Sequence, residues 1–421
     1  MNKKLLVLPV MLFALTSCGG GSNPFRSDTS TTTDQGSKTD ENDRITLVNN
    51  VNEGLKKSYK ASFEKGLNFS TNLNVKGSYD TSDSYSDGKD TVTKSTHVGI
   101  ENFSLENKAF IKNVGDEKVS TNFNDLEIAE ELKLNAKNIE FKSVSPSYDY
   151  KEDGSYTLNE VTSEFKLNEL KDVTGRAYFQ NSKVYADLSD VNVTEIAQSN
   201  LELVKNALAG MQKMDPSTIT DEQAMEMVEG LTKDFPRKFY YTLTEKDVPD
   251  IELPSLTDLA TTLEESKTSI LMYLNLYKDY FTLLKDANNI TTLNVNLDKD
   301  AIKEIVLMNT VDEEGKVPEK DQQEIDEVFK NINRADLHFG LSFDKDFMLK
   351  NVDLEVKFDM NYTAQESSFT KVNFEVKFDT SLDYGDPFVN VPDNFDDYVD
   401  IAEMFNKGEA VPAEEGGAEV I

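Results

Sequence analysis

The sequence of 421 residues contains one cysteine, no tryptophan and only two histidines. A single cysteine, Cys18, excludes a disulfide within the chain. The absence of tryptophan disfavours a sugar site that works by stacking. The histidines, His97 and His338, both occur in strand-like segments without a catalytic motif beside them. The motifs HExxH, GxSxG, GxGxxG and GxxxxGKS/T are also absent, so the sequence predicts a protein that is not an enzyme.

Basic residues are scarce relative to acidic ones. The chain has 44 Lys and Arg against 77 Asp and Glu, which gives a formal net charge of −33 at pH 7. This excess repels the phosphates of nucleic acids and anionic lipid headgroups, so we expect no nucleic-acid binding. Hydrophobic residues make up 38% of the chain, which is enough to build a core. The length allows one large domain or two to three ordinary ones.

The first 18 residues carry the features of an export signal. Lys3 and Lys4 precede an apolar run, 5–14, and the segment Leu15-Thr16-Ser17-Cys18 follows it. The run is typical of a signal peptide and too short to span a bilayer. These residues resemble the bacterial lipobox, and the resemblance implies that Cys18 is acylated, for example with palmitate. It therefore implies a lipoprotein anchored to the extracytoplasmic face of the bacterial cell membrane, at the cell surface. An ordinary secretory signal is the alternative.

Composition divides the chain into four parts. Residues 1–17 form the signal peptide, and 18–43 are the acylated cysteine and a flexible acidic linker rich in Gly, Ser, Thr and Asp. Residues 44–405 are predicted to fold into a β-rich domain. The remainder, 406–421, is predicted to be an acidic disordered tail, for which capture of a basic partner or of divalent cations is the alternative to plain solvation.

The first half of the folded domain changes from helical to strand periodicity. Apolar residues from Ile45 to Tyr59 are spaced by three and four, which predicts an amphipathic helix. Apolar and polar residues then alternate, which predicts antiparallel strands with one solvated face, over 67–75, 132–141, 156–167 and 178–188. The segment 80–90 is dense in Ser, Asp and Gly and is predicted to be a turn.

The second half contains a predicted helical insertion, at about 193–332, before strands return. Its longest helix begins near Ser255 and carries an apolar stripe as far as Leu284. The later segments 352–360 and 372–380 share the pattern Val-x-x-Glu-Val-Lys-Phe-Asp and alternate in polarity, so they predict a hairpin with one apolar face. The fold class predicted from these elements is α+β, with a large antiparallel sheet.

The order of these elements is similar to that of the LolA/LppX superfamily of bacterial lipid carriers. The shared order is a lipoprotein anchor followed by an N-terminal helix, a long meander, inserted helices and returning strands. No diagnostic motif supports the similarity. It implies that the sheet curves into a half-barrel, with the inserted helices packed on one face and acyl chains held beneath them.

Methionines on the predicted helices suggest where such a ligand would lie. Met211 and Met227 lie on two consecutive helices, and Met272 lies on the long one. Flexible thioethers adapt to irregular apolar ligands, so these residues are candidates for a ligand cavity. Ordinary core packing explains the same residues and is the favoured alternative, and both interpretations stay open.

The sequence predicts no metal site and no cofactor. Asp149, Asp153, Gly154 and Glu160 match four positions of an EF-hand loop, but Lys151 replaces an oxygen ligand at the third position. A hairpin turn explains this segment better. The prediction for function is therefore a non-catalytic, membrane-anchored lipoprotein that binds a lipid or another hydrophobic molecule. The alternative is a surface-interaction or envelope-structural lipoprotein without a small-molecule site, and the sequence identifies no protein partner.

Overall fold

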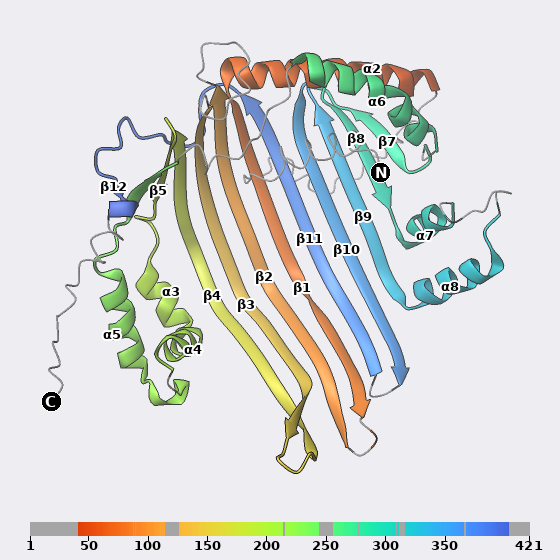
Figure 1. Cartoon of the computed structure of the whole chain (residues 1–421). Helices are drawn as coiled ribbons and strands as arrows, with labels where there is room; N and C mark the ends of the chain where they lie inside the picture. The colour runs from red at the N-terminus through yellow and green to blue at the C-terminus, as the bar shows by residue number, and fades with distance from the viewer. Residues whose placement is uncertain are drawn as a thin grey trace, which may run out of the picture.

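The described residues form one sheet of twelve strands. The computed structural model describes residues 41–86, 88, 90–113, 126–213, 215–243, 256–276, 278–308, 310, 316–365 and 368–403. The predicted signal peptide, Cys18, the linker up to residue 40 and the tail 406–421 lie outside these residues. The predicted α+β class with a large, open antiparallel sheet is confirmed, and the long strands bend along their length (Figure 1).

Long strands occupy the centre of the sheet and short ones its edges. The long strands are β1 (Leu67–Ser86), β2 (Thr91–Asn113), β3 (Leu126–Tyr150), β4 (Tyr156–Gln180), β9 (Ile332–Phe343), β10 (Leu349–Gln365) and β11 (Ser368–Tyr384). The short strands are β5 (Lys183–Asp187), β6 (Lys238–Thr242), β7 (Phe281–Lys285), β8 (Thr291–Leu297) and β12 (Val399–Asp400). Their order is β12-β6-β5-β4-β3-β2-β1-β11-β10-β9-β8-β7, so the two halves of the chain meet where β1 pairs with β11.

Helices lie at one end of the long strands and beside both edges of the sheet (Figure 1). At the end lie α2 (Glu41–Lys65) and α6 (Leu256–Leu276), which contact each other. Beside β4 lie α3 (Val193–Ser199), α4 (Leu201–Gln212) and α5 (Asp221–Thr232). Beside β8 and β9 lie α7 (Lys299–Met308) and α8 (Glu319–Lys330).

Two β-bulges account for part of the bending. Lys76 of β1 stands opposite two residues of β2, because the register shifts between Val75 and Gly77. A second shift sets Asn135 of β3 against Lys171 and Asp172 of β4, and Asn135 Oδ1 accepts a bond of 2.7 Å from the Asp172 amide. Bulges increase local twist and bend a strand. Both bulges lie near the middle of these strands.

Two predicted boundaries are wrong, and one predicted pairing is confirmed. The segment 80–90 is not a turn throughout, because β1 continues to Ser86 and its polar residues pair in register with β2. The long helix ends at Leu276, and the apolar stripe beyond it belongs to β7, which pairs with β8. The predicted helical insertion, at about 193–332, also supplies the strands β6, β7 and β8 to the edges of the sheet. The hairpin of β10 and β11 is confirmed, with Val352 opposite Thr380.

Two buried clusters, one on each face, stabilise the end of the sheet near α2. One contains Leu67, Phe69, Ala109, Phe343, Leu349, Val352 and Leu382, with Val51 of α2 packed against it. The other lies on the opposite face, where the segment after β11 crosses the sheet, and contains Phe110, Ala129, Tyr178, Val389 and Tyr398. Further from α2, a smaller cluster of Phe329, Ile332 and Ala335 joins α8 to β9, and Phe358 and Met360 of β10 pack against it.

Gly54 of α2 sits where the helix touches the turn between β9 and β10. A Cβ atom added at Gly54 would lie 1.7 Å from the Phe347 carbonyl oxygen, whereas one added at Gly230 of α5 would meet nothing within 4 Å. We therefore expect Gly54→Ala to lower the free energy of unfolding by about 1–3 kcal/mol. Gly230→Ala should raise it by about 0.5–1 kcal/mol. Urea unfolding of both variants tests the contact, and stabilisation by Gly54→Ala would contradict it.

Candidate functional site

One face of the sheet is apolar across its central strands. Direct partners in neighbouring antiparallel strands point to the same side. One transverse row consists of Phe165, Phe141, Val98, Tyr79, Val372 and Met360, from β4, β3, β2, β1, β11 and β10. A row nearer α2 consists of Leu134, Leu105, Leu73, Phe378, Leu354 and Phe339. We call this side of the sheet the apolar face.

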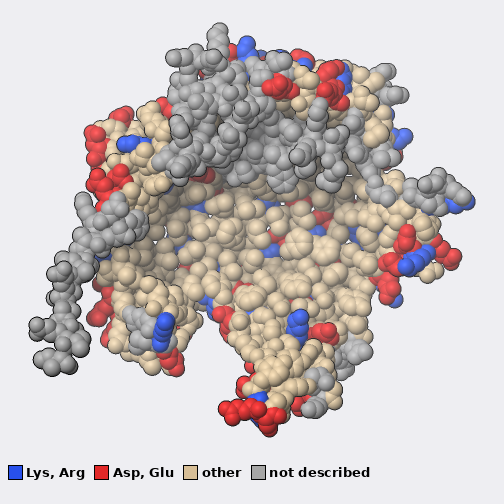
Figure 2. Space-filling model, viewed as in Figure 1, with Lys and Arg blue, Asp and Glu red and all other residues tan. Residues whose placement is uncertain are grey.

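The described helices cover only part of the apolar face. Away from α2, its large side chains are partly open to solvent, with exposed fractions of 39% for Tyr79, 38% for Phe141, 41% for Phe165 and 43% for Tyr362. Figure 2 shows this side as a broad surface with sparse charges between the charged helices at the edges. A contiguous exposed apolar surface marks a binding site more often than chance exposure does.

A pocket continues the apolar face beneath α2 and α6. Its volume is about 170 Å³, and it is lined by Leu47, Val48, Val51, Asn52, Leu55, Ile270, Leu274, Leu293, Leu341, Phe343 and Leu349. A neighbouring groove of about 470 Å³ shares Ile270 and Leu274 with it and reaches Phe281 and Val295 at the sheet edge. The two spaces together extend from the end of the sheet to β7, and both are almost entirely apolar.

The opposite face of the sheet carries ion pairs instead. Lys166 Nζ lies 2.6 Å from Glu140 Oε1, and Lys133 Nζ lies 2.7 Å from Asp172 Oδ1. In each pair the lysine bond lowers the pKa of the carboxylate and raises that of the amine. These groups are solvent-exposed, so each pair stabilises the fold little. Their arrangement shows that this face is the solvated one.

Both histidines lie on the solvated face, beside aspartates that the sequence spacing does not reveal. His97 Nδ1 is 2.6 Å from Asp80 Oδ1. The ring nitrogens of His338 lie 2.9 Å from Asp353 Oδ1 and 2.7 Å from Asn296 Oδ1. The bond to Asp353 raises the pKa of His338 above its usual 6.5, against the opposing effect of burial.

The raised pKa of His338 predicts a pH-dependent contribution to stability. Because protonation is favoured in the folded state, the contribution is complete below about pH 6.5 and declines as the pH rises through the folded-state pKa. We expect the wild type to have a higher free energy of unfolding than His338→Gln. This difference should be constant up to about pH 6.5 and should shrink at higher pH. Since both side chains are about one-third exposed, the change should be small. Urea midpoints at several pH values test this, and an advantage that grows with pH would contradict it.

The three candidate methionines do not come together. Met227 packs into a small cluster between α4 and α5, with Leu208, Ala209, Ile219 and Ala224. Met211 of α4 is 72% exposed and Met272 of α6 is 56% exposed, and α6 lies at the other end of the molecule from α4 (Figure 1). The residues that the methionine pattern missed are the aromatic ones on the apolar face. The sequence feature that could have identified these aromatic residues is the alternation of apolar and polar residues in β3 and β4.

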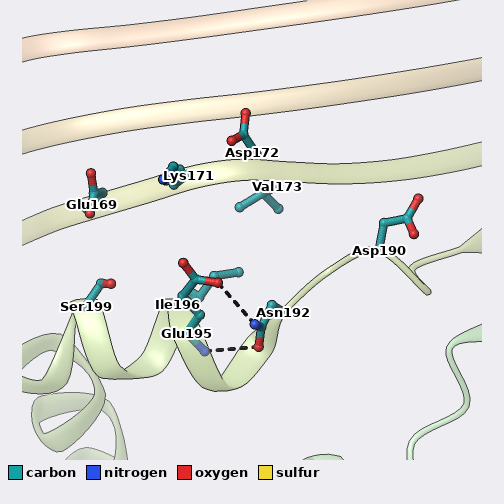
Figure 3. Close-up of a pocket in the computed structure, with 9 residues that line it drawn as sticks. All are labelled: Glu169, Lys171, Asp172, Val173, Asp190, Asn192, Glu195, Ile196 and Ser199. Atoms are coloured by element: carbon teal, nitrogen blue, oxygen red, sulfur yellow. Dashed lines mark hydrogen bonds between the residues drawn. The ribbon is translucent and has the colours of Figure 1, made fainter.

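A polar pocket of about 270 Å³ lies between β4 and the start of α3 (Figure 3). Its lining includes Glu169, Asp172, Asp190 and Glu195. Asn192 caps α3 here, since its Oδ1 accepts a bond of 3.2 Å from the Glu195 amide. Among the residues described, no group of three or more His, Cys, Asp or Glu side chains is arranged to hold a metal ion.

The near-EF-hand segment is a hairpin turn between β3 and β4, as predicted. The Lys151 amide donates to the Ser155 carbonyl at 2.8 Å, and Gly154 adopts a positive φ of 80°. The Asp153 carboxylate accepts bonds from the Ser155 amide and hydroxyl at 2.9 and 2.6 Å. Asp153 therefore stabilises the turn.

Comparison with protein-family models, with curated proteins and with solved structures finds no match. Within the described part of the chain, no helix has the length and apolar character needed to cross a membrane. The resemblance to lipid carriers therefore stays a prediction.

Proposed function

We propose that this protein is a non-catalytic lipoprotein that binds a lipid or another hydrophobic molecule on the apolar face. The observation that supports it is the row of partly exposed Phe165, Phe141 and Tyr79 in the middle of a broad sheet. Exposed aromatic surface of this extent is unfavourable in water. A hydrophobic ligand would remove it from water and fill the adjoining pocket under α2 and α6.

The dimensions of the face suit acyl chains. From Leu73 to Thr81, β1 advances about 27 Å at 3.4 Å per residue. The hydrocarbon layer of one bilayer leaflet is about 15 Å thick. The seven strands from β4 to β9 span about 29 Å at 4.8 Å per strand. A ligand with several chains lying along the strands would therefore fit.

Lipid binding can be tested on the full chain carrying Cys18→Ser, which removes the predicted acylation site without touching the described fold. We expect saturable uptake of a fluorescent fatty-acid probe, and native mass spectrometry should detect co-purified lipid. Absence of both would contradict the proposal. In that case a protein covering the face, as in the surface-interaction alternative, would be the better explanation, and sedimentation would show whether a second copy covers it.

The anchoring part of the proposal rests on Cys18 alone. Because Cys18 is the only thiol in the chain, we expect Cys18→Ser to abolish fatty-acid labelling in bacteria and to move the protein out of the detergent phase on phase partition. Two or more acyl chains give stable anchoring, so the shift should be nearly complete. Continued labelling of the variant would contradict the predicted lipobox.

A further inference from the structure

A row of hydroxyl side chains borders the apolar face at the end away from α2. It runs directly across six strands and consists of Ser163, Ser143, Thr96, Thr81, Thr370 and Tyr362. Each member lies two residues along its strand from the apolar row that contains Tyr79 and Phe141. All six are therefore on the same side as the apolar residues, and we call them the hydroxyl row.

Most of the hydroxyl row has hydrogen-bonding capacity to spare. The Thr81 hydroxyl donates to the Phe369 carbonyl oxygen at 3.2 Å and lies 3.4 Å from the Thr370 hydroxyl. Among the described residues, the hydroxyls of Thr96, Ser143 and Ser163 make no hydrogen bond to a protein group, and Thr96 and Ser143 are half-buried. Half-buried hydroxyls beside an apolar surface favour a ligand that brings polar groups of its own.

The charges around the hydroxyl row cancel. One step further from α2 on the same face, Asp83 of β1 stands directly opposite Lys94 of β2. The row itself and the adjoining apolar row contain no charged residue. The two charges nearest the hydroxyl row, Asp83 and Lys94, are of opposite sign and sum to zero. The net charge of −33 repels an anion, so the site favours an uncharged group that can make hydrogen bonds.

We propose that the ligand is an amphiphile with at least two acyl chains and an uncharged, hydroxyl-bearing headgroup, such as a glycosyl diacylglycerol. The headgroup bonds to the hydroxyl row, and the chains run along the strands towards α2. This inference rests on the proposed function and adds the orientation and the class of headgroup. The distance from Thr81 to Leu73, about 27 Å, accommodates a full-length acyl chain before the face is covered by α2.

The test compares the affinities of three lipids with identical acyl chains for the full-length protein carrying Cys18→Ser. Monoglucosyl diacylglycerol, diacylglycerol and phosphatidylglycerol compete with a fluorescent fatty-acid probe. We expect the glycosyl lipid to bind about three- to tenfold more tightly than diacylglycerol, which corresponds to one or two hydrogen bonds. It should also bind at least about tenfold more tightly than the anionic lipid, because of charge repulsion.

Variants then locate the headgroup. The double variant Thr96→Val with Ser143→Ala keeps the shape of the face but removes the two half-buried hydroxyls without a protein partner among the described residues, and should lose most of the preference for the glycosyl lipid over diacylglycerol. Thr162→Val, on the solvated face of β4, is the matched control and should keep the wild-type preference. A preference retained by the double variant would overturn the assignment of the headgroup to the hydroxyl row.

The wild-type comparison separates this inference from the proposed function. Equal binding of all three lipids, or preference for the anionic one, would overturn the headgroup inference and leave hydrophobic binding intact. Failure of every lipid and of the probe to bind would overturn both. The comparison needs no variant, so it stands even where a substitution disturbs folding.

Discussion

Replacing Phe141 by aspartate is expected to weaken uptake of a hydrophobic probe by at least about 30-fold, while the free energy of unfolding falls by less than about 2 kcal/mol. Phe141 lies between Val98 and Phe165 in the middle of the apolar face and is 38% exposed. Because the site is open, water can still solvate a carboxylate in the free protein. A bound acyl chain would remove that water, and an aspartate is too short to reach solvent past it.

The control for Phe141→Asp is Thr162→Asp. Thr162 is exposed on β4, near Phe165 in sequence but on the solvated face. The substitution Thr162→Asp adds the same charge to the same part of the sheet as Phe141→Asp. It should therefore leave uptake of the probe within about twofold of the wild type. Probe titration and urea unfolding of both variants provide the measurement. Equal loss in the two variants would indicate a general charge effect and contradict a ligand on the apolar face.

The fold was predictable to the extent that its elements follow simple periodicities. The spacing of Ile45 to Tyr59 predicted a helix that exists as part of α2. The shared pattern of 352–360 and 372–380 predicted two strands that pair in register. Each depends on a local repeat of polarity, which the backbone geometry of a helix or a strand converts directly into a buried face.

The wrong boundaries have a common physical cause. In the region 80–86, Ser and Asp alternate with Thr and Tyr, and the composition indicates a turn. The backbone nevertheless stays extended, because β2 and β11 lie on either side of β1 and supply its hydrogen bonds up to Ser82. Similarly, the apolar residues Phe281 and Leu284 fit a helical stripe, but pairing with β8 makes them part of a strand. Tertiary pairing overrides local preference in both segments.

The candidate site was less predictable than the fold, because alternation shows which residues share a face but not whether anything covers that face. Phe141 and Phe165 lie in segments that were predicted only to be strands with one solvated face. Their direct opposition, and the matching opposition of Ser143 and Ser163 two residues further along, follow only from the register. The three candidate methionines do not come together, because α4 lies beside β4 whereas α6 packs against α2 at the end of the long strands.

The same register explains how the two faces divide their roles. On the solvated face, charged side chains pair across strands, as in Lys166 with Glu140. On the apolar face, the transverse rows are uniform in character: apolar from Leu73 to Tyr79 and hydroxyl-bearing at Thr81. A sheet that only had to fold would gain stability from covering the apolar rows. The described helices leave them partly open, and this is the basis for assigning them to a ligand.

The other large effect is expected at the opposite end of the apolar face, where Phe343→Ala should lower the free energy of unfolding by about 3–5 kcal/mol. Phe343 is 1% exposed and packs with Leu349 and Phe69 in the cluster beneath α2. It also lines the pocket between α2, α6 and the sheet. Removing the ring therefore takes away buried contacts and enlarges an apolar space that stays dry without a ligand. Phe388→Ala, at a side chain that is 51% exposed, is the control and should cost less than about 1 kcal/mol.

Phe343→Ala also tests whether the pocket belongs to the binding face. A ligand that binds the folded state alone stabilises it by about 2.7 kcal/mol at a hundred times its dissociation constant. If acyl chains reach the pocket, a saturating fatty acid should add more stability to Phe343→Ala than to the wild type, because the enlarged space accepts more of the chain. Urea unfolding with and without the fatty acid measures both gains. Equal stabilisation of the two proteins would exclude the pocket from the site. No stabilisation of either would contradict binding of the fatty acid to the folded protein.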